Sequence, residues 1–324
     1  MMKALSDCHV LVTPTSFGKN DMNLKTQLES LVGHVTYNTT GKPFDAQTLS
    51  ELIIDVDGYI AGLDTIDATV LAHAKHLRVI ARYGTGVSNV DLDAAKAHAV
   101  TVTNTPAANA KSVAELTIAL ILNLIRPIIV ASQDTRNGGW MRTDGFSMEG
   151  KTVGLIGLGA IGRETARKLQ GFDCHVMAYD VAPNIKFADS LNIEIVTSIQ
   201  PLLKQADFVS LHVPLSPNTF EMVNANFLSQ MKQGAYVINT ARGGLVDEKA
   251  LYESIQNEHL AGAALDVFCE EPPSRENPLL QLPQVITTPH MGAHTDGATN
   301  TMGWMAVESC LAVLRGEDPP YRVV

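Results

Sequence analysis

Three polar residues in the second half of the sequence could carry out acid–base chemistry, because each follows an apolar run typical of a strand. Arg242 follows VINTA, Glu271 comes shortly after LDVF, and His290 follows TTP. If these runs are parallel strands of one doubly wound sheet, the three side chains lie at its carboxyl edge, where such folds bind ligands. We therefore treat the three residues as a candidate catalytic set.

These residue types suit hydride transfer between a nicotinamide and a 2-hydroxy or 2-oxo acid. A histidine titrates near neutral pH, so His290 can take a proton from the 2-hydroxyl or return it. The Glu271 carboxylate would favour the imidazolium and orient the ring. The planar fork of Arg242 fits the substrate carboxylate. Taken alone, each could be an ordinary loop, surface or strand-capping residue, but their equivalent positions favour the catalytic interpretation.

A glycine-rich turn supplies the expected cofactor site. Gly157, Gly159 and Gly162 read G-x-G-x-x-G between an apolar run at 152–156 and a helical pattern that continues to Leu169. The first glycine permits a tight turn, the second lets a pyrophosphate approach the backbone, and the third lets the helix pack on the strand. The amides and dipole at the helix start favour the phosphates.

Asp180 completes this pattern 18 residues after Gly162, at the end of an apolar run at 175–179. A carboxylate at this spacing accepts hydrogen bonds from ribose hydroxyls and repels a 2′-phosphate, so we expect NAD rather than NADP. A strand–helix unit that binds nothing is the alternative, and the ordered combination argues against it. The candidate cofactor residues in this region are Gly157, Gly159, Ala160, Ile161, Gly162 and Asp180.

Strands and helices alternate along the whole chain, which indicates an α/β protein. Strands are expected at 8–13, 35–37, 58–61, 77–81, 100–103, 152–156, 175–179, 193–196, 208–212, 235–239, 261–267 and 284–287. Helices are expected at 24–31, 48–54, 68–74, 92–98, 112–124, after the glycine turn to 169, and at 199–204, 226–230, 249–257 and 295–315. We predict two doubly wound parallel-sheet domains, a flavodoxin-like substrate domain and a Rossmann NAD-binding domain, with a ligand cleft between them.

The substrate domain is expected to be discontinuous, because the last helix is needed to complete it. It comprises residues 1–103 plus 291–324, and the NAD-binding domain comprises 104–290. Ser112 is expected as the N-cap of the helix at 112–124, with Glu115 completing a capping box.

Composition argues against several classes of function. The 324 residues suffice for two domains, and 45% are hydrophobic. The formal net charge is −10 and no cluster of Lys and Arg is present, so nucleic acid and anionic membranes are poor partners. The apolar stretch 114–130 is interrupted by Arg126 and Pro127, and we interpret it as a buried or interface helix. The N-terminus lacks the apolar core of a secretory signal.

The four cysteines are scattered and form no C-x-x-C pair. We expect free thiols, no metal site and a reducing, cytoplasmic environment. Cys269 lies near Glu271 and could be a reactive thiol, although a simple loop residue is the favoured interpretation.

A second glycine-containing loop could bind an anion in the first domain. Tyr83, Gly84, Thr85 and Gly86 follow the strand at 77–81. Glycines there can turn backbone amides inward to form an anion nest. An ordinary turn between strand and helix is the alternative.

Together, these motifs resemble the D-isomer-specific 2-hydroxyacid dehydrogenase family over essentially the whole chain. They are RYGTGVSNVD from Arg82, SVAE from Ser112, the glycine core, LHVPL from Leu211, NTARGG from Asn239, LDVF from Leu265 and PHMGAHT from Pro289. The nearest likeness is to the phosphoglycerate dehydrogenase-like branch.

The resemblance implies roles for particular residues. Arg242, Glu271 and His290 match the family's catalytic set, and the 83–86 loop would hold the substrate carboxylate through backbone amides. A homodimer built on the cofactor domain is also implied, which suits the apolar helix at 112–124. The resemblance also implies that Asp266 contacts the nicotinamide carboxamide. The other residues expected along the cofactor are Ser112, His212, Pro214, Thr240, Ala241, Arg242 and His290.

The sequence departs from the family pattern in the first domain. Phosphoglycerate dehydrogenases carry a phosphate-binding arginine just after the strand that here ends at Ala61, and Gly62, Leu63 and Asp64 stand in its place. Losing a cation and gaining Asp64 weakens the case for a phosphorylated substrate. Ser88 and His294 also depart from the pattern. The chain ends at Val324 without the family's C-terminal regulatory domain, so serine feedback is not expected.

We therefore expect an NAD-dependent enzyme that acts on a small 2-hydroxy or 2-oxo acid. An alternative is an NAD(H)-sensing binding protein like the C-terminal-binding-protein corepressors, which share this fold and can keep the catalytic set. The chain shows no extra interaction segment or long tail that would favour this alternative. Formate dehydrogenase relatives pair the histidine with glutamine, so Glu271 argues against that assignment.

Overall fold

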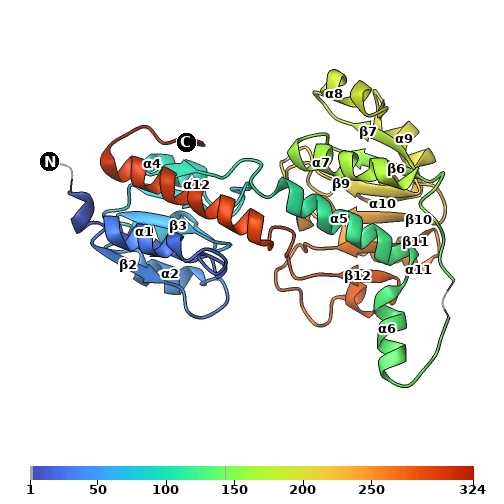
Figure 1. Cartoon of the computed structure of the whole chain (residues 1–324), viewed down its shortest axis with the longest axis horizontal. Helices are drawn as coiled ribbons and strands as arrows, with labels where there is room; N and C mark the ends of the chain where they lie inside the picture. Colours follow the sequence, from blue (N-terminus) through green and yellow to red (C-terminus); the bar gives the residue numbers. More distant parts are fainter. Residues whose placement is uncertain (1–2, 143) are drawn as a thin grey trace. The chain divides into compact units, whose positions relative to one another are not determined.

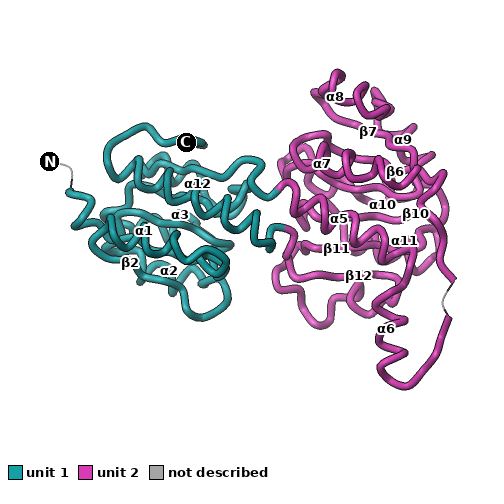
Figure 2. The backbone as a smooth tube through the Cα atoms, in the orientation of Figure 1, with its two compact units in different colours: residues 1–109, 293–324 teal, residues 110–292 magenta. Residues whose placement is uncertain are grey.

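The computed structural model describes residues 3–142 and 144–324 and contains two compact units (Figures 1 and 2). Unit 1 comprises residues 1–109 and 293–324, and unit 2 comprises residues 110–292. The boundaries predicted at 103 and 290 lie six and two residues before those of the units. The chain therefore leaves unit 1 once and returns to it for the last helix.

Unit 1 is built on a five-stranded parallel sheet with the order β2-β1-β3-β4-β5. Its strands are β1 (His9–Val12), β2 (His34–Tyr37), β3 (Gly58–Ala61), β4 (Val79–Arg82) and β5 (Thr101–Thr103). Every residue of β3 and β4 is buried, which is expected of parallel strands covered on both faces.

Helices cover both faces of this sheet. Helices α1 (Asn23–Leu31) and α12 (Asp296–Arg315) share one hydrophobic core with β1, and α2 (Ala46–Leu52), α3 (Ala68–His73) and α4 (Leu92–Ala97) share the other. Helix α12 therefore belongs to the core of unit 1, because it packs on β3 and β4 (Figure 1). Aspartate side chains cap α2, α3 and α4, and Thr295 caps α12.

Unit 2 contains a seven-stranded parallel sheet with the order β12-β11-β10-β9-β6-β7-β8. Its strands are β6 (Thr152–Ile156), β7 (His175–Tyr179), β8 (Glu194–Ile195), β9 (Phe208–Leu211), β10 (Ala235–Asn239), β11 (Leu260–Leu265) and β12 (Val285–Thr287). The order reverses beside β6, which places the glycine turn at the switch point of the sheet. The predicted α/β class with two parallel sheets is confirmed.

Two helical layers enclose the unit 2 sheet. Helices α5 (Ala110–Ile125), α7 (Ala160–Leu169) and α8 (Ile185–Ser190) contribute to one core. Helices α9 (Ile199–Gln205), α10 (Ala225–Ser229) and α11 (Glu248–Gln256) contribute to the other. Helix α8 was not predicted, since its short IKFADS segment has no clear apolar period.

The predicted capping box at Ser112 is wrong. Helix α5 begins at Ala110, so Ser112 lies inside its first turn, and the Ser112 hydroxyl donates to the backbone oxygen of Gly292 at 2.6 Å. Glu115 instead pairs with Lys168 of α7 at 2.9 Å. The local S-x-x-E pattern was overridden by contacts made within unit 2.

The apolar stretch 114–130 is not one helix. It breaks near Pro127, and α6 (Ile128–Arg136) follows α5 at an angle of 65°. Helix α5 is largely buried, whereas Ile128, Ile129 and Val130 are 59%, 56% and 46% exposed. Within the described ranges, no single helix meets the length and hydropathy of a membrane span, and only the bent pair α5–α6 does so jointly.

Candidate active site

Glu271 and His290 form the centre of the candidate site, in the loops that follow β11 and β12. His290 Nδ1 lies 2.6 Å from Glu271 Oε2, and the other carboxylate oxygen accepts from the backbone N of Phe268 at 3.2 Å. Both side chains are partly exposed, at 28% and 34%. With Nδ1 engaged by the carboxylate, Nε2 is the nitrogen left to exchange a proton with a substrate.

The charge environment keeps Glu271 ionised. Burial alone would raise the pKa of Glu271, but the hydrogen bond and charge of His290, the Phe268 amide and the charge of Arg242 together hold the pKa below its ordinary value. The carboxylate is therefore a stable partner for a protonated imidazole.

Asp266 shapes the loop that carries His290. Its buried carboxylate accepts from Thr288 Oγ1 at 2.6 Å and from the backbone N of Met291 and Gly292, each at 2.9 Å. Its backbone oxygen accepts from His290 N at 2.8 Å. His290 has a φ of +48°, a left-handed conformation that non-glycine residues adopt only where their surroundings hold them. The contact of Asp266 with the nicotinamide stays a prediction.

Arg242 is positioned by a turn at the end of β10. The Asn239 amide accepts from Ala241 N at 3.0 Å and donates to Arg242 O at 2.8 Å, and Arg242 Nη1 donates to Ala241 O at 2.6 Å. Burial lowers the pKa of Arg242, while the Glu271 carboxylate opposes this change. Asn239, the residue that holds this turn, was not predicted from the sequence, although its place at the end of the strand, three residues before Arg242, was a usable signal.

Gly243 brings the Arg242 turn into backbone contact with the segment leading to Glu271. A Cβ atom at Gly243 would lie 1.9 Å from the carbonyl carbon of Phe268 and 2.4 Å from the backbone N of Cys269. No side chain fits there without moving one of the two loops. The glycine thus permits Arg242 and Glu271 to share one site within unit 2.

The glycine turn between β6 and α7 fits a dinucleotide. Gly157 has a φ of +97° and Gly162 packs against the Gly157 carbonyl, 2.1 Å from where a Cβ would stand. By contrast, a Cβ at Gly159 would meet nothing within 4 Å, so that side of the turn is open to a ligand. No side chain caps the start of α7, which leaves its first amides for phosphate oxygens.

Asp180 is held beside this turn. One carboxylate oxygen accepts from Leu158 N at 2.6 Å and the other from Ala182 N at 2.8 Å. The side chain is thereby fixed in orientation, and each oxygen retains a lone pair for a ribose hydroxyl. This arrangement fits the adenosine end of NAD.

His212 lies directly under the turn, because its backbone oxygen is 2.7 Å from where a Cβ of Gly157 would stand. Ring atom Nε2 shares a hydrogen bond with Ser210 Oγ at 3.0 Å, and Nδ1 is buried with no partner among the described residues. Burial lowers the pKa of His212 to about 4, so the ring is neutral at physiological pH.

The remaining predicted cofactor residues are largely engaged with the protein. Thr240 is buried and shares a hydrogen bond with Thr117 at 3.1 Å, as Ser112 does with Gly292. Pro214 is exposed and its carbonyl accepts from Thr219 at 2.7 Å. Their contacts with a cofactor stay predictions.

The predicted anion loop of unit 1 follows β4 and is firmly held. The Tyr83 hydroxyl donates to Thr299 O at 2.8 Å, and Thr85 Oγ1 donates to Thr105 O at 3.1 Å. Arg82 is buried, and its guanidinium donates to Asn89 and to backbone oxygens. The side chains therefore pack into unit 1, and the amides of Tyr83 and Gly84 donate to Ala61 O at 3.0 Å and Arg82 O at 2.9 Å. The amides of Thr85 and Gly86 are the part of the loop that remains a candidate for binding an anion.

Asp64, which stands where phosphoglycerate dehydrogenases carry an arginine, is buried and does not present its charge to a ligand. The carboxylate is 1% exposed and accepts hydrogen bonds from the Thr13 hydroxyl, from Tyr59 OH at 3.0 Å and from Phe44 N at 2.7 Å. It ties the loops after β1 and β3 together. The absence of an arginine at this strand end is the part of the departure that still bears on substrate choice.

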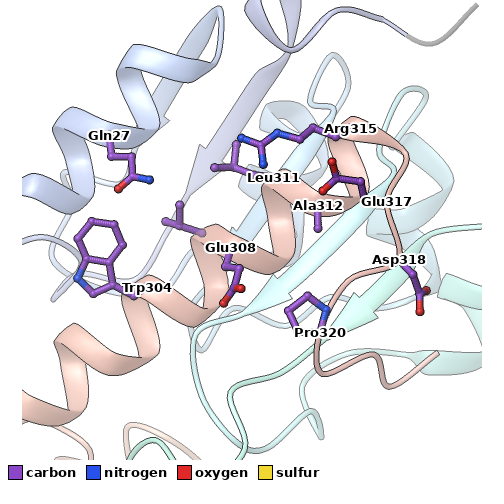
Figure 3. Close-up of a pocket in the computed structure, with 10 residues that line it drawn as sticks. Gln27, Trp304, Glu308, Leu311, Ala312, Arg315, Glu317, Asp318 and Pro320 are labelled. Carbon is purple, nitrogen blue, oxygen red and sulfur yellow. The ribbon is translucent and has the colours of Figure 1, made fainter.

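One hollow lies apart from the predicted site residues. A hollow of about 370 Å³ on unit 1 is lined by α1, α12 and the segment that follows, including Gln27, Trp304 and Arg315 (Figure 3). All four cysteines are free, and burial with the nearby Glu248 charge raises the pKa of Cys269 to about 12, which disfavours a reactive thiolate. The described residues contain no group of three metal-ligating side chains.

The chain is similar to one enzyme family over most of its length. Residues 118–292 match the model of the D-isomer specific 2-hydroxyacid dehydrogenase NAD binding domain. D-3-phosphoglycerate dehydrogenase of Methanocaldococcus jannaschii is 42% identical over 274 residues, 84% of this chain and 52% of that relative. Glyoxylate reductase of Korarchaeum cryptofilum is 36% identical over 288 residues, 87% of this chain and 86% of the relative.

A solved structure is similar over the whole fold. The TT0316 protein of Thermus thermophilus has a TM-score of 0.86 and 37% identity, and the match covers 98% of this chain and 100% of that one. The chain spans about half the length of the phosphoglycerate dehydrogenases that it matches.

Proposed function

Because this chain belongs to the D-isomer specific 2-hydroxyacid dehydrogenase family, we propose that it transfers a hydride between NAD and C2 of a small D-2-hydroxy or 2-oxo acid. The observation that carries the proposal is the 2.6 Å contact between His290 and Glu271, with Arg242 close enough to influence the carboxylate. This set unites a proton donor, its charge partner and an anion-binding group.

The protein's own part in the reaction is proton transfer and orientation. When bound, NAD supplies the hydride chemistry. In reduction, His290 donates a proton from Nε2 to the oxygen at C2, and Glu271 stabilises the imidazolium before the transfer. In oxidation, neutral His290 takes the proton from the hydroxyl. Arg242 binds the substrate carboxylate and so presents C2 to the histidine.

The cofactor is proposed to bind to unit 2. The amides of Gly159, Ala160 and Ile161 would bind the pyrophosphate, and Asp180 would accept hydrogen bonds from the adenosine ribose. Further residues proposed along the cofactor are Ser112, His212, Pro214, Thr240, Ala241 and Asp266. In unit 1, the loop of Tyr83, Gly84, Thr85 and Gly86 is proposed to bind the substrate carboxylate, with the amides of Thr85 and Gly86 as its donors.

The substrate class follows from the relatives and from one strand end. Relatives of this chain are named as acting on phosphoglycerate and on glyoxylate. The strand end after Ala61 carries Gly62, Leu63 and a buried Asp64. We therefore place the substrate among small 2-oxo acids of the phosphohydroxypyruvate, hydroxypyruvate or glyoxylate type.

The test is NADH oxidation by the full chain at neutral pH with glyoxylate, hydroxypyruvate, pyruvate, longer 2-oxo acids and phosphohydroxypyruvate, with NADPH in parallel. Turnover of at least one acid with NADH supports the proposal, and the preferred acid identifies the side chain at C3. NADH binding without turnover of any acid would contradict it and favour an NAD(H)-sensing protein.

We also propose that the protein forms a homodimer through unit 2 and works in the cytoplasm. Helix α6 exposes Ile128, Ile129 and Val130 to solvent, and Trp140 nearby in sequence is 79% exposed. Grouped exposed apolar side chains of this size are typical of protein interfaces. The support comes from α6, whereas the helix first expected at the interface, α5, is mostly buried in its own unit. The free cysteines suit a reducing compartment.

A further inference from the structure

Glu248, the first residue of α11, reaches the segment that carries Glu271. Its Oε1 accepts a hydrogen bond from the backbone N of Cys269 at 2.7 Å, and its Oε2 accepts one from Asn277 Nδ2 at 2.7 Å. Glu271 lies between these two partners in the chain. A single half-buried carboxylate thus fastens both ends of the segment 269–277.

The far end of this segment is anchored in the core. While the Asn277 amide nitrogen donates to Glu248, its oxygen accepts from Leu279 N at 3.0 Å and caps the 3₁₀ helix η4 (Pro278–Gln281). Leu279 is fully buried in the unit 2 core. Both polar atoms of Asn277 are therefore used, which fixes the side chain that Glu248 holds.

The near end of the segment lies against the Arg242 turn. Gly243 permits close approach of that turn to the Phe268–Cys269 peptide, and the Cys269 thiol lies 3.8 Å from Val246 O. The stretch from Arg242 to Glu248 therefore contacts the 269–277 segment at its two ends, Cys269 and Asn277. The stretch from Arg242 to Glu248 thus contains Arg242 of the proposed catalytic set and holds the segment that carries Glu271.

We propose that Glu248 is a positioning residue, whose two hydrogen bonds hold the 269–277 segment so that Glu271 meets His290. The catalytic consequence rests on the proposed function. Glu248 acts through Glu271, because its carboxylate is bonded to the loop and not to His290. Neither the glycine turn nor Asp180 is part of this contact, so NADH binding should not depend on it.

Two variants and one control test the proposal in the full chain. Glu248→Ala removes both acceptors, and Glu248→Gln keeps one carbonyl oxygen. Glu253→Ala is the control, since this residue lies on the same helix and its exposed carboxylate is 3.9 Å from Lys249. We expect Glu248→Ala to lower kcat/KM for 2-oxo acid reduction about 10- to 100-fold. Glu248→Gln should recover part of the loss, and Glu253→Ala should match the wild type, with NADH affinity unchanged in all three.

A second readout separates this proposal from the proposed function. Histidine NMR of the full chain, assigned with His290→Ala, reports the environment of the His290 ring without substrate. The ring signals at one fixed pH should shift in Glu248→Ala, because a displaced Glu271 no longer makes the 2.6 Å contact with Nδ1. If Glu248→Ala folds poorly, Glu248→Gln should show a smaller shift in the same direction.

Two outcomes have different consequences. Unchanged His290 ring signals in a folded variant would overturn the positioning role, even if activity falls. Failure of the wild type to reduce any 2-oxo acid would overturn the proposed function, while the NMR comparison would still decide the role of Glu248.

Discussion

Glu271 and His290 are separated by 19 residues in the chain, yet the carboxylate and the imidazole meet at 2.6 Å. The contact joins the loops after two neighbouring strands, β11 and β12, which pair in the parallel sheet. Neither loop makes the pair alone: Asp266 shapes the His290 loop, and Glu248 fastens the Glu271 loop. The proposed acid–base pair therefore forms because the parallel pairing of β11 and β12 brings the loops after these strands together.

Replacement of His290 tests the proton transfer. We expect His290→Ala to lower kcat about 10²- to 10⁴-fold, the usual size of a general acid–base contribution. Stopped-flow measurement should show a much smaller effect on NADH affinity than on turnover, because His290 is only one of the proposed cofactor contacts. His175→Ala at an exposed position of β7 is the matched control. Wild-type turnover in His290→Ala would remove this residue from the mechanism.

Replacement of Glu271 tests the charge partner. In Glu271→Gln the imidazolium loses its carboxylate, so we expect reductive kcat/KM at neutral pH to fall about 10- to 100-fold. The acid limb of the wild-type pH profile should be absent in the variant, because the carboxylate that is protonated there has been removed. Superimposable pH profiles for the variant and the wild type would contradict the pairing.

The same residue predicts a pH dependence of stability. The pKa of Glu271 is lowered in the folded protein, so its ionised form stabilises the fold above the ordinary value of 4.5. That contribution is lost as the pH falls through the lower folded pKa. Denaturant unfolding should therefore show Glu271→Gln less stable than the wild type at pH 6, with the difference shrinking below pH 4.5. A stability difference between Glu271→Gln and the wild type that grows on acidification would contradict this prediction.

Replacement of Asp180 tests cofactor choice. We expect Asp180→Ala to weaken NADH binding and to reduce the preference for NADH over NADPH by about 10-fold or more, because one carboxylate no longer repels the 2′-phosphate. The ratio of kcat/KM for the two cofactors measures this effect. Asp189→Ala, an exposed position in α8, is the control, and an unchanged ratio in Asp180→Ala would place selectivity elsewhere.

Gly243 tests the contact between the two catalytic loops. A methyl group at Gly243 would collide with the Phe268–Cys269 backbone, so Gly243→Ala should lower kcat/KM about 100-fold by displacing Glu271 from Arg242. Gly171→Ala is the matched control, since a Cβ there meets nothing within 4 Å. Activity within twofold of wild type in Gly243→Ala would show that the loops tolerate separation.

Helix α6 tests the proposed dimer. We expect Ile128→Glu combined with Ile129→Glu to convert the protein from dimer to monomer, because buried charges at an apolar interface are costly. Sedimentation velocity measures the mass of the particle. Val181→Glu, at a residue 91% exposed in the same unit, should leave the dimer intact. A double variant that remains dimeric would place the interface away from α6.

The sequence predicted the fold and the glycine turn well for local reasons. Apolar runs with helices between them specify parallel strands, and Gly157 and Gly162 are required by their own backbone conformation and packing. The order of Arg242, Glu271 and His290 after successive strands also predicted their common sheet edge. In each case the information lay within a few residues of the feature.

The errors involve contacts between residues distant in sequence. Ser112 had the spacing of a helix cap, but its hydroxyl bonds to Gly292, 180 residues later. The charge of Asp64 was taken to weaken the case for a phosphorylated substrate, but its carboxylate is buried and accepts hydrogen bonds from Thr13 and Tyr59. Glu248 had no local signal of any role, because its partners Cys269 and Asn277 lie beyond another strand. Such pairings follow from tertiary packing, which a local pattern does not encode.

The return of α12 to unit 1 also sets an order of events during synthesis. Met302, Val307, Cys310, Leu311 and Leu314 of this helix are buried in the core that covers one face of the unit 1 sheet. Residues 110–292 are translated between that sheet and its helix, a delay of roughly 10–40 s at ordinary elongation rates. Unit 2 can therefore complete its core on the ribosome while the part of the first sheet that α12 covers is still exposed, and we expect this nascent sheet to bind chaperones.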